Sequence, residues 1–597
     1  MLTQSEQNNL IQKIKHLHSA DEKQLEVIFS DNQRIIVEAP AGYGKTKTMI
    51  SKVAYLLATG RIANPKKILA LTFSVNAACK IKKEISEYLP QLIQSSNSKQ
   101  LRISEKLYVS NYHGFCRHIL KRYGYLLHPN LYNLDQLKSI DDSKTEGITG
   151  LLEISYDNAS IFSKYSDAVK NRDQSYLQNN FDEYTNGIIE KFVDKGFISF
   201  NAILTLTLKL FRNYGEILGF YQDYFPIIIV DEFQDTNPLS WALLKKLISD
   251  KTQLFFMGDS LQKIYGFIGA INNLMSEAER LFSMHRISLD QNYRFMSNPQ
   301  MLRLDKNIRL NAENPSNPSI QINAEVPLIV TNNQLEEAER IVKTINSLLN
   351  ENPLYKIAIL VNQNKGKNID KILEVISKNN ISHFYALFGD EDTEYLSFHR
   401  ECSFQFTNHF KKNTRISSKS LMEFHLNIRE RFKDNSSSVI KSLLNLLEVF
   451  LSRILSDYSF LSLEDKFVLI KDTFDNRSLK QNMEYVQKNI IVSTIHGAKG
   501  LEWDYVLMPD MEQYSMPNWY GLCGACNHKR NCDLTVDNRN EKNFVEQLSV
   551  FYVGVTRARK QVFFSASKTR LNKYGNPEPT NLSCLLKLSG IVLVEKE

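Results

Sequence analysis

A glycine-rich segment at residues 38–48, EAPAGYGKTKT, carries residue types that suit the binding of nucleotide phosphates. Gly42 and Gly44 let backbone N–H groups turn inward and approach phosphate oxygens. Lys45 offers a positive charge for the β- and γ-phosphates, and Thr46 offers a hydroxyl that can bind Mg2+. We therefore predict a nucleotide-binding loop here. The alternative is a glycine-rich strand–helix turn that contains a lysine by chance.

A pair of adjacent carboxylates, Asp231 and Glu232, could complete such a site. Hydrolysis of a nucleoside triphosphate requires a carboxylate that holds Mg2+ and a group that activates or orients water beside the γ-phosphate. We assign Asp231 to the first task and Glu232 to the second; the alternative is a charged turn after a strand. Two more residues of the phosphate loop belong to the predicted site: Ala39, which replaces the first glycine of the usual pattern, and Lys47.

Parallel strands would bring these distant groups together. The apolar run Arg34–Val37 predicts a buried strand before the phosphate loop, and Tyr224–Val230 predicts another before the carboxylates. The carboxyl ends of such strands share one edge of an open α/β sheet, where ligands bind. A second strand–helix series begins near Pro327 without a second phosphate loop. Helix Phe544–Arg559 and strand Gln561–Ala566 close this second series.

The alternation of strands and helices predicts an α/β protein with two parallel-sheet cores, each interrupted by a mainly helical insertion. The insertions are the charged, tyrosine-rich stretch 117–201 and the stretch 391–485. The predicted division is a first core of residues 1–116 and 202–297, a first insertion of 117–201, a second core of 298–390 and 486–597, and a second insertion of 391–485.

Composition narrows the class of protein. The chain has 597 residues, of which 43% are hydrophobic and 23% charged, which is typical of a globular protein with several domains. No apolar run approaches 18 residues, so we expect no membrane span. The N-terminus lacks the apolar core of a signal peptide, and we expect a cytoplasmic location. The net charge of +7 permits a nucleic-acid partner but fits an ordinary solvated surface equally well.

Three of the seven cysteines lie close together in LCGACNHKRNCD, residues 522–533. Cys523 and Cys526 form a CxxC turn that suits a tetrahedral ion, and His528 and Cys532 could add two ligands to a zinc site. His528 is only two residues after Cys526, which is tight for simultaneous ligation. The alternatives are an iron–sulfur cluster with a further thiolate, or reduced thiols in a loop without metal.

Eight motifs in fixed order resemble, taken together, those of the superfamily 1A DNA helicases of the UvrD, Rep and PcrA type. The resemblance runs from about Gln24 to Ala566. It implies two RecA-like motor cores, ATP and Mg2+ as ligands, and insertions where the family has its 1B and 2B subdomains. The motifs are AGYGKTKT, LTFSVNAA, NYHGF, VDEFQDTN, GDSLQKIYGFIGA, QNYR, TIHGAKGLEW and YVGVTRA.

The resemblance also implies roles for individual residues of the ATP site. Gln24 would read the adenine, Tyr293 would stack on it, and Glu502 would face the ribose. Arginine fingers can contribute about 10³–10⁵ in rate by stabilising the charge that spreads over the transferred phosphoryl group. The remaining implied roles are those of the γ-phosphate sensor, Gln262, and of the two arginine fingers, Arg294 and Arg557.

Single-stranded DNA, by the same resemblance, would cross the top of both cores. Stacking on an aromatic side chain is worth about 1–3 kcal/mol per base and tolerates any sequence. Taken singly, each of these side chains is explained as well by burial in a core; their places within the motifs favour the DNA path. The residues implied along this path are Phe73, His113, Tyr265, Phe267 and His496.

The function that the resemblance implies is an ATP-dependent helicase or translocase moving 3′ to 5′ on single-stranded DNA, with single-stranded and tailed duplex DNA as partners. Two departures favour an alternative. Phe267-Ile268 stands where the family often has Trp-Arg, and 391–485 is shorter than the usual 2B insertion. The alternative is an ATP-gated DNA-sensing module of a larger complex, beside a nuclease or a repair or phage-defence protein. A third reading is an ATPase indifferent to nucleic acid.

Overall fold

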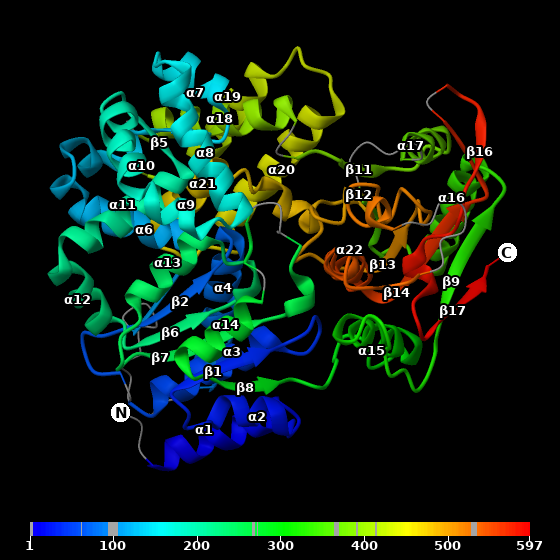
Figure 1. Ribbon diagram of the computed structural model, residues 1–597, viewed down its shortest axis with the longest axis horizontal. Helices are drawn as coiled ribbons and strands as arrows, with labels where there is room; N and C mark the ends of the chain where they lie inside the picture. Colours follow the sequence, from blue (N-terminus) through cyan, green and yellow to red (C-terminus); the bar gives the residue numbers. More distant parts are fainter. Residues whose placement is uncertain are drawn as a thin grey trace.

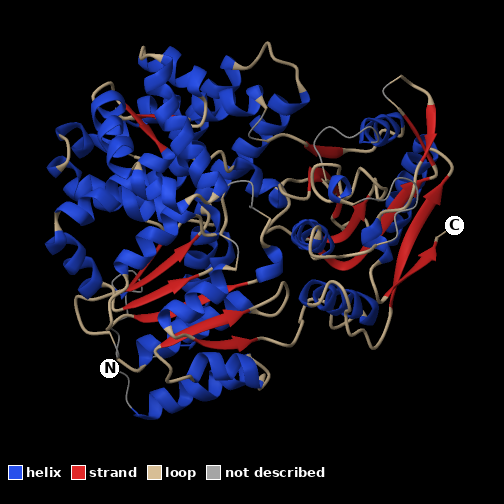
Figure 2. Ribbon diagram, viewed as in Figure 1, coloured by secondary structure: helices blue, strands red, loops and turns tan. Residues whose placement is uncertain are grey.

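The computed structural model describes residues 4–596 with the exception of 61, 93–105, 265–268, 272, 363–368, 390–391, 412–414, 527–533 and 573. The described chain forms two large, entirely parallel sheets, with many helices packed above the first of them (Figures 1 and 2). The prediction of an α/β fold with two parallel-sheet cores is confirmed. Among the described helices, we find none with the length and apolar character needed to cross a membrane.

The first sheet has six strands in the order β3-β2-β6-β7-β1-β8. The central strand β1 buries Ile36 in one hydrophobic cluster and Ile35 and Val37 in another, so both faces of the sheet are covered, as parallel sheets require. Because the strands are parallel, the carboxyl ends of β1 and β6 point to the same edge of the sheet. The strands are β1 (Arg34–Glu38), β2 (Ile68–Thr72), β3 (Leu107–Asn111), β6 (Ile227–Val230), β7 (Gln253–Gly258) and β8 (His285–Ser288).

The helices around the first sheet include a long group that follows β3 and lies above the sheet in Figure 1. A short parallel pair, β4 (Lys138–Ile140) with β5 (Phe197–Ser199), joins two parts of that group. Helices that cover the sheet itself are α1 (Gln4–Leu17), α2 (Glu22–Phe29), α3 (Lys45–Ala58), α4 (Val75–Leu92), α13 (Pro238–Leu247) and α14 (Leu274–Phe282). Those of the group are α6 (Tyr112–Tyr123), α7 (Thr145–Leu152), α8 (Tyr156–Asn171), α9 (Gln174–Asn179), α10 (Phe181–Gly187), α11 (Phe200–Asn213) and α12 (Gly215–Tyr224).

The second sheet has seven strands in the order β11-β12-β10-β13-β14-β9-β17. Its central strand β10 again divides its side chains between two clusters, with Ala358 and Leu360 in one and Ile357, Ile359 and Val361 in the other. The strands are β9 (Ala324–Thr331), β10 (Ile357–Val361), β11 (His383–Ala386), β12 (Ile490–Thr494), β13 (Trp503–Met508), β14 (Ala558–Ser567) and β17 (Ile591–Glu595), with a separate hairpin of β15 (Thr569–Leu571) and β16 (Pro577–Pro579).

Helix α15 connects the two sheets. Asn298 caps its first turn by accepting hydrogen bonds from the backbone N–H groups of Gln300 and Met301, and Pro299 occupies the first helical position. The helices of the second half are α15 (Pro299–Glu313), α16 (Gln334–Glu351), α17 (Ile369–Lys378), α18 (Thr393–Lys411), α19 (Ser418–Arg431), α20 (Ser438–Leu455), α21 (Leu463–Asp475) and α22 (Glu541–Val555).

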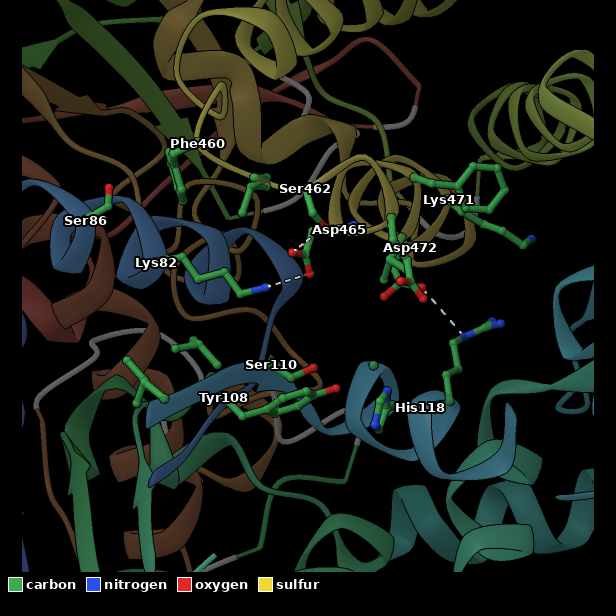
Figure 3. A pocket seen from close by; sticks show the side chains of 18 of the residues that line it. Lys82, Ser86, Tyr108, Ser110, His118, Phe460, Ser462, Asp465, Lys471 and Asp472 are labelled. Carbon is green, nitrogen blue, oxygen red and sulfur yellow. Dashed lines mark hydrogen bonds and ion pairs between the residues drawn. The ribbon is translucent and has the colours of Figure 1, made fainter. Parts of the chain in front are cut away.

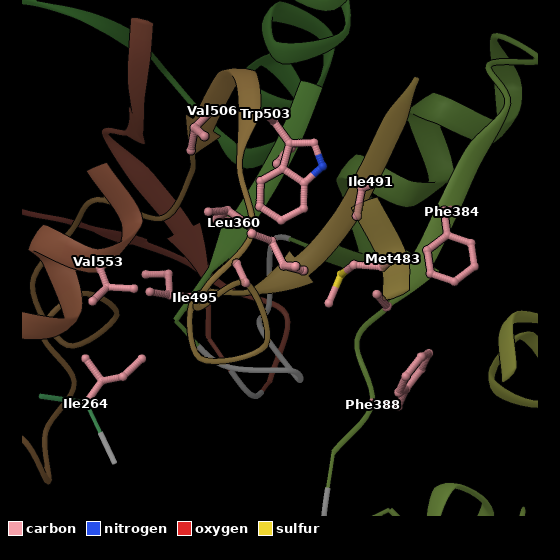
Figure 4. Close-up of a cluster of buried hydrophobic side chains, with 14 of the residues drawn as sticks. Ile264, Leu360, Phe384, Phe388, Met483, Ile491, Ile495, Trp503, Val506 and Val553 are labelled. Atoms are coloured by element: carbon pink, nitrogen blue, oxygen red, sulfur yellow. The ribbon is translucent and has the colours of Figure 1, made fainter. Parts of the chain in front are cut away.

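One hydrophobic cluster reaches from the second sheet to the first core. The cluster includes Trp503, Val506 and Leu360 of the second sheet, and Ile264, which follows β7 of the first, belongs to the same cluster. Figure 4 shows Ile264 on the side of this cluster where Val553 of α22 lies. The two cores are therefore packed against each other through apolar side chains as well as through the polar groups described below.

Several element boundaries differ from the sequence predictions, and two of them are instructive. The strand predicted at Tyr224–Val230 begins only at Ile227, because α12 continues to Tyr224 and Pro226 has no backbone N–H to offer a neighbouring strand. The helix predicted to reach Arg559 ends at Val555, and Arg559 lies in β14. The first error comes from an apolar run, whose composition does not distinguish a buried helix end from a buried strand. The second concerns residues 556–559, TRAR, which contain no glycine or proline to mark the end of the helix.

Candidate active site

The phosphate loop lies between β1 and α3, as the sequence predicts. Gly42 has φ +86° and Gly44 has φ +78°, which is backbone that favours glycine. A Cβ on Gly42 would lie 2.7 Å from the Cβ of Arg294, and one on Gly44 would lie 2.6 Å from Nε2 of Gln24. The loop therefore has no room for side chains at either position. Ala39 is buried and donates its N–H to the carbonyl of Gly258 at 2.7 Å.

The two carboxylates meet Lys45 at the edge of the sheet. The Lys45 ammonium lies 3.5 Å from Oδ1 of Asp231 and forms a closer ion pair with Glu232. Glu232 has φ +51°, a left-handed conformation that is rare outside glycine and that often marks functional sites. Burial opposes ionisation of Glu232, but the charges of Lys45 and Lys499 outweigh it and lower the pKa of this carboxyl to about 2.

The donor set at this edge fits a nucleotide with Mg2+. Oδ1 of Asp231 is buried and has no hydrogen-bond partner among the described residues; its contact is the longer ion pair with Lys45. An anionic oxygen in that position is what Mg2+ binds. Thr46 lies close by in the first turn of α3, at the helix N-terminus where phosphates bind.

A cavity of about 680 Å3 opens in front of the phosphate loop. This volume is in the range of pockets that hold small ligands. Its walls come from both cores and from α2 and α4, so the site exists only where the two cores meet. The lining includes Gln24, Gly42, Gly44, Lys45, Thr46, Lys47, Glu232, Gln262, Tyr293, Arg294, Glu502 and Arg557, all of them residues that the sequence singled out.

Each of the two arginines contacts the opposite core at the rim of this cavity. Arg294 donates to the carbonyl of Thr556 and pairs with Glu502. Arg557 is buried and donates through Nη2 to Oε1 of Gln262 at 3.4 Å. Burial together with the charge of Arg294 lowers the pKa of Arg557 to about 10, which still leaves it charged at neutral pH. The roles of these residues as arginine fingers, γ-phosphate sensor and ribose contact stay predictions.

Two ion pairs across the interface between the cores were not anticipated from the sequence. Lys499 pairs with Asp235 at 2.6 Å and also donates to the carbonyl of Gln262 at 2.7 Å. Arg309 contacts both carboxylate oxygens of Asp259 at 2.7 Å. Lys499, Asp235 and Asp259 lie inside the motifs quoted above. They could have been found as charged motif residues without an assigned role. Arg309 lies outside the motifs and has no such signal.

We predict that removing the Lys499 charge destabilises the protein by about 3–5 kcal/mol, because Asp235 is left as an unpaired buried carboxylate. Burial already raises the pKa of Asp235 to about 6 against the opposing charge of Lys499. A folded-state pKa above the unfolded value costs stability as pH rises toward it, so the loss in Lys499→Met should be larger at pH 8 than at pH 6. Urea unfolding at both pH values measures it.

The matched control is the double variant Lys499→Met with Asp235→Asn, which removes both charges together. It should regain most of the lost stability, because the buried charge is gone. The single variant Asp235→Asn completes the comparison. If the stability losses of the two single variants add up to the loss of the double variant, the ion pair contributes nothing to the contact between the cores.

A second cavity, of about 650 Å3, lies between the first core and α21. Figure 3 shows Lys82 of α4 directed at Asp465, with which it pairs at 3.6 Å, and Asp472 further along the same helix, α21. Arg117 of α6 pairs with Asp472 at 3.6 Å and with Asp475 at 3.2 Å. Ion pairs at both sides of the cavity thus hold α21 against the helices that follow β2 and β3.

The residues implied along the DNA path have mixed environments. Phe73 is half-buried after β2, and His113 packs against Phe200 with ring centroids 4.6 Å apart. Burial lowers the pKa of His113 to about 3 and that of His496 to about 4, so both imidazoles are neutral at neutral pH in the protein without DNA. Tyr265 and Phe267 lie outside the described residues. The DNA path stays a prediction.

The cysteine segment gives no support to a zinc site. The buried thiol of Cys523 donates to the carbonyl of Pro517 at 3.1 Å, and Cys526 accepts from Asn540 at 3.6 Å. His528 and Cys532 lie outside the described residues. Within the described part of the chain, no group of three or more His, Cys, Asp or Glu side chains is placed to hold a metal ion.

Comparison with known proteins agrees with the geometry of the site. Residues 20–283 match the UvrD/REP helicase N-terminal domain, and residues 391–569 match the UvrD-like helicase C-terminal domain. A probable DNA helicase II homolog of Mycoplasma genitalium is 24% identical over 92% of this chain and 84% of its own length. The corresponding protein of Rickettsia conorii is 24% identical over 93% of each chain. The ATP-dependent DNA helicase PcrA of Staphylococcus aureus is 22% identical over 96% of this chain and 86% of its own.

Proposed function

The chain belongs to the UvrD/REP helicase family, and on this premise we propose that it is an ATP-dependent DNA helicase that moves 3′ to 5′ along single-stranded DNA. The observation that carries the proposal is the cavity in which the phosphate loop and Glu232 of the first sheet face Glu502 and Arg557 of the second. A site divided between two cores couples the chemical step to their relative position.

The chemistry follows from the residues present. Asp231 and Thr46 would hold Mg2+, which supplies positive charge next to the phosphates when bound. Lys45 turns from its carboxylate partners toward the phosphates, and Glu232 then orients the attacking water. Arg294 and Arg557 stabilise the charge that develops on the phosphoryl oxygens.

Movement on DNA follows from the position of Arg557. This residue belongs to the second core, so hydrolysis requires both cores to be engaged, and loss of the γ-phosphate weakens that engagement. In the proposal, residues 1–116 with 202–297 and residues 298–390 with 486–597 are the two motor cores. Residues 117–201 and 391–485 are the insertions that guide the DNA, and the place of action is the cytoplasm.

Strand displacement on tailed duplexes tests the proposal. With purified protein, ATP and Mg2+, we expect displacement from a duplex with a 3′ single-stranded tail and none from a matched duplex with a 5′ tail. Single-stranded DNA should also stimulate ATP hydrolysis. The control omits Mg2+, because Asp231 and Thr46 require the ion to act on the nucleotide.

Other results select the alternatives. DNA-stimulated hydrolysis without displacement from either duplex would favour a DNA-sensing module of a larger complex over an autonomous helicase. Hydrolysis that ignores DNA would contradict both. Zinc near Cys523 and a nuclease, repair or phage-defence partner remain hypotheses from the sequence; metal analysis of protein purified without chelator decides the first.

A further inference from the structure

His18 lines the nucleotide cavity next to Gln24, the residue expected to read adenine. None of the sequence motifs includes His18. Both side chains are 2% exposed. Nδ1 of His18 bonds to Oε1 of Gln24, and Nε2 lies 2.8 Å from the hydroxyl of Ser51 on α3. We propose that His18 is a positioning residue for base specificity, which fixes the Gln24 amide so that the site takes adenine and rejects guanine. This inference rests on the proposed function in one respect, the binding of an adenine nucleotide in this cavity.

The hydrogen bonds determine which way the Gln24 amide faces. Nε2 of Gln24 lies 3.0 Å from the carbonyl of Tyr43, which can only accept, so the amide nitrogen must be on that side. The amide oxygen then faces His18, and Nδ1 of His18 must carry a proton to donate to it. Nε2 of His18 is left to accept from the Ser51 hydroxyl, which requires a neutral ring.

The charge state of His18 agrees with this pattern. Burial lowers the pKa of His18 from its ordinary value, and the positive charge of Lys47 acts in the same direction, while the bond to Gln24 and the charge of Asp21 oppose them. The imidazole is therefore neutral at neutral pH, with one donor and one acceptor. Ser51 and Gln24 take one each, so the chain Ser51–His18–Gln24–Tyr43 has a single consistent direction.

Asp21 also holds Gln24 in place, through the backbone N–H of that residue. Asp21 caps α2 by accepting the backbone N–H of Gln24 at 2.9 Å, and its second oxygen accepts from the hydroxyl of Tyr293. Tyr293 lines the same cavity and is the residue expected to stack on the base. The backbone of Gln24 and the ring of Tyr293 are thus both anchored by Asp21 at the start of α2.

The fixed amide keeps one N–H and one oxygen lone pair for a ligand. Adenine presents the matching pair, the N7 acceptor and the N6 amino donor, and glutamine reads them together. Guanine presents two acceptors, N7 and O6, so its O6 would face the Gln24 oxygen without a hydrogen. A buried polar group left unpaired is what gives strong discrimination between similar substrates. Without His18, the amide is held through Nε2 alone and can turn away from the base.

The test compares adenine and guanine nucleotides in His18→Leu, His18→Asn and a control, His16→Leu, which changes an exposed histidine of α1. The readouts are kcat/KM for ATP and GTP, and equilibrium binding of ADP and GDP by calorimetry without turnover. His18→Leu should lower the preference for adenine roughly tenfold in both readouts, with kcat at saturating ATP changed less than about threefold. His18→Asn, which keeps an N–H near the Nδ1 position, should restore most of the preference, and His16→Leu should match the wild type.

Equal losses for both bases in His18→Leu, or failure of His18→Asn to restore the preference in folded protein, would overturn the inference. Should His18→Leu fail to fold, Ser51→Ala carries the test, because it removes the group that fixes the ring from the other side and should also lower the preference. The proposed function is tested separately: if the wild type hydrolyses no ATP, the preference for ADP over GDP still decides the role of His18.

Discussion

Lys45→Ala is expected to reduce ATP hydrolysis at least about a hundredfold while leaving the protein folded. The Lys45 side chain extends into the nucleotide cavity and contacts the carboxylates of Asp231 and Glu232. Its removal takes away the positive charge that the phosphates require and removes no apolar volume from the core. Steady-state hydrolysis with and without single-stranded DNA measures the effect.

A suitable control is Lys371→Ala. Lys371 is a partly exposed lysine of α17 that pairs with Glu374 at 2.9 Å, so the substitution also removes a lysine–carboxylate pair. It should leave hydrolysis within error of the wild type, because surface ion pairs contribute little and this one is remote from the cavity. Turnover by Lys45→Ala at the level of this control would contradict the assignment of the whole site.

Lys45→Ala should also change the titration of its partner. The pKa of Glu232 is held at about 2 by Lys45 and Lys499 against the effect of burial. A lowered carboxyl pKa stabilises the fold above the ordinary value of the group and loses that contribution as pH falls through the folded-state value. Without Lys45 that stabilisation shrinks, so the variant should lose stability relative to the wild type above about pH 5 and approach it at lower pH.

Glu232→Gln is expected to keep ATP binding and to reduce hydrolysis by about 10²–10⁴. The amide is nearly isosteric with the carboxylate but cannot orient or deprotonate water. Glutamine can keep the hydrogen bond at 2.6 Å in which Gln234 donates to Glu232, since its carbonyl oxygen accepts as the carboxylate does. The variant should therefore retain the local fold, including the left-handed backbone at this position.

The complex of Glu232→Gln with unhydrolysed ATP should bind single-stranded DNA more tightly than the wild type does during turnover. The two cores stay engaged as long as the γ-phosphate remains between Lys45 and Arg557. Calorimetric binding of ATP and single-turnover hydrolysis separate binding from chemistry. Glu374→Gln, at a partly exposed carboxylate of α17, is the matched control. Loss of ATP binding in Glu232→Gln would mean that the residue supports the loop structurally and does not act on water.

Short-range sequence features determined the individual parts of the site. Gly42 and Gly44 permit the backbone angles of the phosphate loop, and the apolar runs before Ala39 and Asp231 form the strands that carry these residues to one edge of a sheet. Such features are predictable because turn conformation and strand burial depend on residues close together in the chain. The family resemblance added the order of the motifs and the division into two cores.

Long-range pairing was decided only by the tertiary structure. Lys499 and Asp235 are 264 residues apart, and Arg309 and Asp259 come from different cores, so neither pair follows from a local pattern. The same holds for the contact between His18 and Ser51, which are 33 residues apart and meet because α1 packs on α3.

The sequence by itself thus determined the phosphate loop and the carboxylates that follow β6, because each is encoded in a few consecutive residues. It also determined the fold class, through the alternation of strand and helix patterns along the chain. Only the tertiary structure decided the partners of Arg294 and Arg557, the buried ion pairs between the cores and the fixed direction of the Gln24 amide. The physical reason is that these contacts depend on packing between distant segments. Side chains such as Arg309 carry no local sign of the partner that their burial requires.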